Sequence, residues 1–134
     1  MSLVFSLSPA SDVPIYRQII QHIQRSIIQG HLKRGEQLPP VRVLAESLVV
    51  NPNTVARAYQ DLIRDGLLES RSGIGVFVTE KRQVFSQAER ERRLDEAMRP
   101  LLLEALILDF SLPQTQAALE AKWRDLQNPK RRNP

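Results

Sequence analysis

The chain has 134 residues, 42% of them apolar, which suffices for one compact domain, or for one small domain with an appendage. It has no cysteine, which excludes a disulfide framework and a thiolate metal site. Its two histidines make a histidine-based metal cluster unexpected. The net charge of +4 is compatible with a nucleic-acid partner, but residues 1–80 hold eight Lys/Arg against seven Asp/Glu. A DNA-binding surface must therefore come from basic side chains gathered on one face of the domain.

The first predicted helix covers residues 14–29. Asp12 can cap it, Pro14 fits its first turn, and Gly30 is well placed to end it. Its apolar stripe recurs every four residues and consists of Ile15, Ile19, Ile23 and Ile27, widened by Ile20 and Ile28.

Two more helices are predicted at 40–48 and 52–65. Pro40 starts the first of them, and Asn51 with Pro52 gives the second a cap and a first turn. The second helix has one apolar face, formed by Val55, Ala58, Tyr59, Leu62 and Ile63. Because about three residues separate the two helices, they must meet at a sharp angle, as in a helix-turn-helix.

After Gly66 the pattern changes to two short strands, 67–70 and 75–78. The turn between them, 71–74, contains Gly73, which can supply a positive φ. A hairpin directly after the third helix is a wing. The sequence therefore predicts a mainly α (α+β) fold, with a winged helix-turn-helix domain and a two-stranded wing over residues 1–80.

The helical pattern returns at Ser86, which forms a predicted capping box with Glu89. Pro100 is expected to kink or divide this helix. A second helix starts at Ser111 and runs to about residue 127. We predict a two-helix dimerisation segment over residues 81–127 and a disordered basic tail over residues 128–134.

The outward side of the third helix holds the first candidate DNA contacts. Its apolar face packs on the other two helices, so Asn53, Thr54 and Arg57 point outward near its N-terminus. This part of a recognition helix reaches base edges in the major groove, where asparagine can bind adenine and arginine can bind guanine. Arg71, placed at the wing, can enter the narrow minor groove.

Three stretches resemble the GntR family of bacterial transcription regulators. Residues 32–45 read LKRGEQLPPVRVLA, residues 51–55 read NPNTV and residues 72–78 read SGIGVFV. They match the family's opening signature, recognition helix and wing in the right order, and the resemblance covers about residues 13–79. It implies a repressor that binds double-stranded DNA as a homodimer, and a two-fold dimer reads an inverted-repeat operator.

The family's contact positions fall on particular residues of this chain. Arg42 matches the arginine of the second helix, which contacts a phosphate or a base. The start of the recognition helix and the tip of the wing match Asn51, Asn53, Thr54, Ser72 and Gly73. Many members have arginines where Pro52 and Ala56 stand here, so Arg57 is expected to supply part of that contact.

The residues after position 80 separate two subgroups that share the NPNTV sequence. MocR-like proteins continue into a large aminotransferase-like domain that binds pyridoxal phosphate, whereas YtrA-like proteins have a short helical tail that dimerises. The two predicted helices resemble the YtrA-like tail. Residues 101–110 are apolar nearly all round, so a second subunit is expected to cover them. The predicted dimer contacts are Leu94, Met98, Leu101, Leu102, Leu106, Leu119 and Trp123.

Two alternatives stay open: a winged-helix protein-interaction module that binds no DNA, and an N-terminal fragment of a MocR-like pyridoxal-phosphate regulator. A small-molecule effector bound between the two parts also stays open, and nothing in the sequence identifies one. No stretch reaches the roughly 18 apolar residues that span a bilayer, and the start lacks a signal-peptide pattern, so we expect a cytoplasmic protein. Neither His22 nor His31 has a carboxylate or nucleophile at a suggestive spacing, so we expect no enzyme, cofactor or metal.

Overall fold

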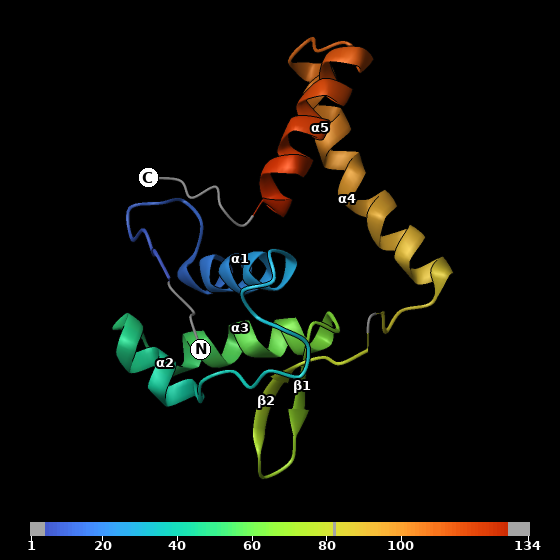
Figure 1. The fold of residues 1–134 in the computed structure, drawn as a ribbon. Coiled ribbons are helices and arrows are strands. Elements are labelled where there is room, and N and C mark those ends of the chain that lie inside the picture. Colours follow the sequence, from blue (N-terminus) through green and yellow to red (C-terminus); the bar gives the residue numbers. More distant parts are fainter. Residues whose placement is uncertain (1–4, 82, 129–134) are drawn as a thin grey trace. The chain divides into compact units, whose positions relative to one another are not determined.

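The computed structural model describes residues 5–81 and 83–128 of the chain. Its elements, in order, are α1 (Ile15–Ile28), α2 (Val41–Leu48), α3 (Pro52–Arg64), β1 (Leu68–Arg71), β2 (Gly75–Val78), α4 (Gln87–Ile107) and α5 (Leu112–Gln127) (Figure 1). They belong to two compact units, Met1–Arg82 and Gln83–Pro134. The predicted fold class, mainly helical α+β with a two-stranded wing, is confirmed.

One apolar core holds the three helices of the first unit together. Helices α1 and α2 each pack on α3 (Figure 1). Ile19 and Ile23 of α1 share this core with Val55 and Leu62 of α3, and all four are fully buried. The three predicted helices are confirmed to within one residue at each end, but Asp12 does not cap α1, whose N-cap residue is Pro14 and has no side-chain bond.

Helices α1 and α2 end in the same way but with different residue types. In both, a left-handed residue follows the helix, and the next backbone N–H donates to a carbonyl of the last turn. That left-handed residue is Gly30 after α1, with φ 81°, and Val49 after α2, with φ 56° and ψ 51°. A β-branched residue in this conformation is strained by about 1–2 kcal/mol because its Cβ crowds the backbone.

Replacing Val49 by asparagine is expected to raise the free energy of unfolding by about 0.5–1.5 kcal/mol, because asparagine tolerates the left-handed conformation. The Val49 side chain is 90% exposed, so the change removes little packing. Denaturant unfolding measures the effect. Gly30→Ala is the matched control: a Cβ at Gly30 meets nothing within 4 Å, so backbone strain alone should destabilise this variant. A less stable Val49→Asn chain would contradict the assignment of strain.

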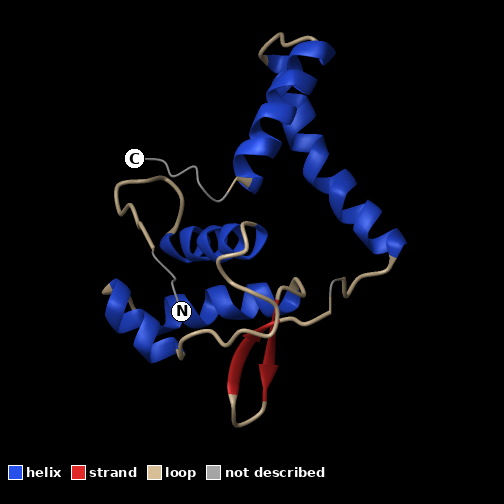
Figure 2. Cartoon of the chain, viewed as in Figure 1, coloured by secondary structure: helices blue, strands red, loops and turns tan. Residues whose placement is uncertain are grey.

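The wing is an antiparallel hairpin of β1 and β2 (Figure 2). Within it, Leu68 pairs with Val78. The predicted strand 67–70 was placed one residue too early, and Arg71 lies in β1 rather than in the turn. Residues 35–38, from the link between α1 and α2, hydrogen-bond to the other edge of β2. The wing is therefore braced by the chain that precedes α2.

Both helices of the second unit start at the predicted serines, but the predicted capping box at Ser86 is only half formed. Ser86 caps α4 by accepting the N–H of Glu89 at 3.2 Å. The Glu89 carboxylate pairs with Arg92 in the following turn, and hydrogen bonds from arginine lower its pKa to about 2. The complete capping box instead lies at the start of α5, between Ser111 and Gln114.

Neither α4 nor α5 has a buried residue. Pro100 does not divide α4, which runs unbroken from Gln87 to Ile107.

No helix in the described part of the chain combines the length and apolar character needed to cross a membrane. The predicted tail, 128–134, lies outside the described residues from position 129 onward.

Candidate nucleic-acid interface

The start of α3 is fixed by its own cap. The side-chain oxygen of Asn51 accepts the backbone N–H of Asn53 at 2.8 Å, and Pro52 stands in the first turn, where no helical N–H partner is needed. Asn53 and Arg57 are exposed, and Thr54 is half-buried. The polar residues predicted to read bases are thus held on a helix with a fixed start, and Asn51 itself serves as the cap.

Tyr59 ties α3 to the beginning of α2. Its ring is 2% exposed, and its hydroxyl donates to the Pro39 carbonyl oxygen at 2.7 Å. Burial raises the pKa of the Tyr59 hydroxyl well above its usual value, because the phenolate would lose its hydration. Since α2 begins two residues after Pro39, this bond also fixes Arg42, in the first turn of α2, relative to α3.

The raised pKa of Tyr59 predicts a loss of stability in alkali. Above pH of about 10, the unfolded chain releases the tyrosine proton while the folded chain retains it, so the free energy of unfolding falls as pH rises. This residue should contribute a slope of up to about 1.4 kcal/mol per pH unit. Tyr59→Phe should be less stable than the parent by about 1 kcal/mol at neutral pH, and that difference should shrink in alkali.

Denaturant unfolding of the parent and of Tyr59→Phe at several pH values tests this expectation. The chain has one other tyrosine, Tyr16, and Tyr16→Phe provides the matched control. Equal alkaline slopes for the parent and Tyr59→Phe would contradict the prediction.

Arg71 does not stand free at the tip of the wing. Its guanidinium is 3.1 Å from a carboxylate oxygen of Glu69 and 3.2 Å from one of Glu80, and it lies 4.0 Å from the centre of the Phe77 ring. These pairs engage two of the five N–H donors of the guanidinium. They also join the wing to Glu80, in the segment that follows it.

The tip of the wing is formed by Ser72 and Gly73, both exposed. Gly73 has φ 74°, and a Cβ built there meets nothing within 4 Å, so its backbone is open to a close approach. Gln37 supports the turn from behind by donating to the Ile74 carbonyl oxygen at 3.1 Å. Gln37 carries no signal in the sequence, because its role arises only when the link before α2 lies against β2.

Arg42 and Arg57 keep their hydrogen-bond donors available. In the part of the chain that the structure describes, neither forms an ion pair, whereas Arg64, on the outward side of α3, pairs with Asp61. The Arg57 guanidinium carbon lies 3.8 Å from the centre of the Tyr16 ring. Tyr16 was not among the predicted site residues, because it stands outside the isoleucine stripe of the first helix.

Comparison with known proteins identifies the family. Residues 15–78 match the model of the bacterial regulatory proteins, gntR family. The chain is 34% identical over 102 residues to the HTH-type transcriptional repressor YtrA of Bacillus subtilis (strain 168), covering 76% of this chain and 78% of that protein. The chain belongs to the gntR family. The predicted family, and the similarity to YtrA within it, are confirmed.

Two further similar proteins match mainly the first unit. The chain is 47% identical over 68 residues to the probable rhizopine catabolism regulatory protein MocR of Rhizobium meliloti, which covers 51% of this chain but spans 14% of MocR. The DNA-binding domain of AraR, solved in complex with operator ORX1, is similar with a TM-score of 0.50 and 31% identity, over 56% of this chain and 93% of that one.

One solved structure resembles both units. A chain described as a transcriptional antiterminator from Listeria monocytogenes EGD-e has a TM-score of 0.85 and 25% identity, covering 98% of each chain. The winged helix and the helical second unit therefore occur together in another protein.

Proposed function

We propose that this chain is a DNA-binding transcription regulator that represses its targets as a homodimer on an inverted-repeat operator. The observation that carries the proposal is the outward face of α3, where Asn53 and Arg57 are exposed opposite a buried side and Thr54 is half-buried beside them. The names of similar proteins support it, because YtrA is called a repressor and the AraR domain was solved with an operator.

The geometry suggests a division of roles within the interface. Arg57 and Asn53 contact base edges in the major groove, since arginine suits guanine and asparagine suits adenine. Arg42, in the first turn of α2, contacts a phosphate. The backbone at Gly73 approaches the minor groove, because the tip has open space there.

The exposed apolar side chains of the second unit support homodimerisation. Helices α4 and α5 have no buried residue, although they carry many large apolar side chains. Isolated helices of this kind are marginal in water, since most helical stability comes from packing an apolar face. A second copy would cover the predicted contact residues, whose exposure runs from 40% at Met98 to 70% at Leu106. These residues are Leu94, Met98, Leu101, Leu102, Leu106, Leu119 and Trp123.

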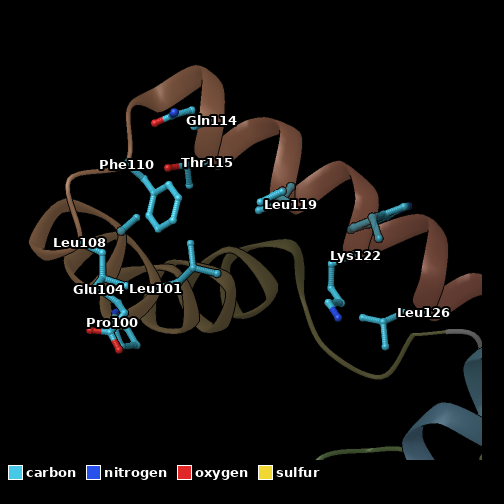
Figure 3. A pocket seen from close by; sticks show the side chains of 13 residues that line it. Pro100, Leu101, Glu104, Leu108, Phe110, Gln114, Thr115, Leu119, Lys122 and Leu126 are labelled. Atoms are coloured by element: carbon cyan, nitrogen blue, oxygen red, sulfur yellow. The ribbon is translucent and has the colours of Figure 1, made fainter. Parts of the chain in front are cut away.

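The space between α4 and α5 has the character of an interface. A mainly apolar cleft of about 720 Å³ lies between the two helices, and Leu101, Phe110 and Leu119 line it (Figure 3). Trp123 also lines the cleft and is 63% exposed. Apolar surface of this extent is unfavourable in water, so the cleft suits a helix of the second copy.

Selection of bound duplexes from a random DNA library, followed by sequencing, tests the proposal. We expect an enriched inverted repeat with half-sites about one helical turn apart. Enrichment of a single half-site would support DNA binding and contradict the dimer. No enrichment at low or moderate salt would contradict DNA binding and favour a winged-helix interaction module. Repression is tested separately, by a reporter gene placed behind the selected duplex.

A further inference from the structure

Tyr16 and Arg57 join the first helix to the candidate recognition helix. The Arg57 guanidinium carbon lies 3.8 Å from the centre of the Tyr16 ring. Arg57 is exposed on α3, whereas Tyr16 is half-buried in the first turn of α1. A guanidinium over an aromatic face is attracted by the negative charge of that face. The contact therefore favours one placement of a long side chain that would otherwise sample many.

The ring orients Arg57 without using its hydrogen-bond donors. A carboxylate accepts guanidinium N–H groups and offsets the charge, as happens at Arg64 and Arg71. Among the described residues, Arg57 has no acidic partner, so its fork of donors remains available for a base edge. This combination of a fixed guanidinium and free donors is what a bidentate contact to guanine requires.

The helix that carries Tyr16 is anchored in the core. Ile19 lies one helical turn after Tyr16 and is fully buried with Val55 of α3 in the same core. The helix that carries the ring and the helix that carries Arg57 are therefore fixed to each other. A ring on a helix fixed in this way can position a group on the neighbouring helix within the tolerance that recognition needs.

We propose that Tyr16 is a positioning residue for DNA recognition: its ring holds the Arg57 guanidinium ready for a guanine edge, and its own hydroxyl does not touch DNA. The inference rests on the proposed DNA-binding function. Its physical basis is preorganisation, because a side chain ordered before binding loses less conformational entropy on the DNA.

A double-mutant cycle on the duplex selected by the parent chain tests this role. Tyr16→Leu should weaken binding roughly 2- to 5-fold, the range for an exposed cation–π contact. It should also relax the base preference at the same position that Arg57→Ala relaxes. Tyr16→Phe keeps the ring and should bind like the parent. In the Arg57→Ala background, Tyr16→Leu should have no further effect on affinity or base preference.

Several results would overturn the inference. Equal losses from Tyr16→Leu with and without Arg57 would show a role independent of the arginine, and a loss in Tyr16→Phe would show a contact of the hydroxyl. Parent-like binding by Tyr16→Leu would remove the role while leaving DNA binding intact. If the parent enriches no duplex, the proposed function fails together with the inference. Tyr16→Met replaces Tyr16→Leu if thermal unfolding shows that the leucine variant does not fold.

Discussion

Replacing both Leu102 and Leu106 by glutamate is expected to give a monomer of 15.3 kDa, in place of a parent of twice that mass. The two residues are 43% and 70% exposed and stand four positions apart, so they share one side of α4. Two adjacent carboxylates cannot be buried against a second copy without a large desolvation cost. Light scattering gives the mass directly.

The same double variant should lose most of its affinity for the inverted repeat. A dimer that contacts two half-sites binds with an affinity roughly 100-fold or more above that for one half-site. This gain in affinity disappears when the two copies separate. Binding to a single half-site should remain close to the parent, because the first unit has its own core. Ile28→Glu is the matched control, since Ile28 is a 59% exposed apolar residue of α1 in the first unit. A dimeric Leu102→Glu/Leu106→Glu chain would refute this interface.

Arg57→Ala is expected to weaken binding by about 1–3 kcal/mol and to abolish base preference at one position of each half-site. The expectation follows from the exposed position of Arg57 on α3 and from its donors, which no acidic group occupies among the described residues. Arg42→Ala should instead weaken binding to all sequences alike. It should also lower the slope of log affinity against log salt concentration by about 1, because one phosphate contact is lost. Titrations over a salt series, with the selected duplex and single-base variants of it, separate the two effects.

Arg64→Ala is the control for both arginine variants. Arg64 has the same charge and also lies on the outward side of α3, but it is paired with Asp61. Its removal should leave base preference unchanged. If Arg57→Ala binds every duplex as the parent does, Arg57 is not a base-reading residue. If Arg42→Ala changes preference at one base pair, its assignment to a phosphate is wrong.

Local signals in the sequence sufficed for the elements and their order. Asn51 and Pro52 mark the start of α3 because capping and first-turn preferences act within a few residues. Gly30 and Gly66 mark helix ends because each needs a positive φ. Only the serine half of the predicted capping box at Ser86 forms, and the Glu89 carboxylate pairs instead with Arg92 and Arg93 on the same helix.

The sequence by itself therefore determined the winged helix-turn-helix order, the outward face of α3 and the apolar second unit, since each depends on periodicity and short-range preferences. Only the tertiary structure decided which partners the arginines have. Arg71 is engaged by Glu69 and Glu80, whereas Arg57 lies against Tyr16, which precedes it by many residues. Such partners come together through packing of the core, and the spacing of residues along the chain does not predict which distant side chains will meet.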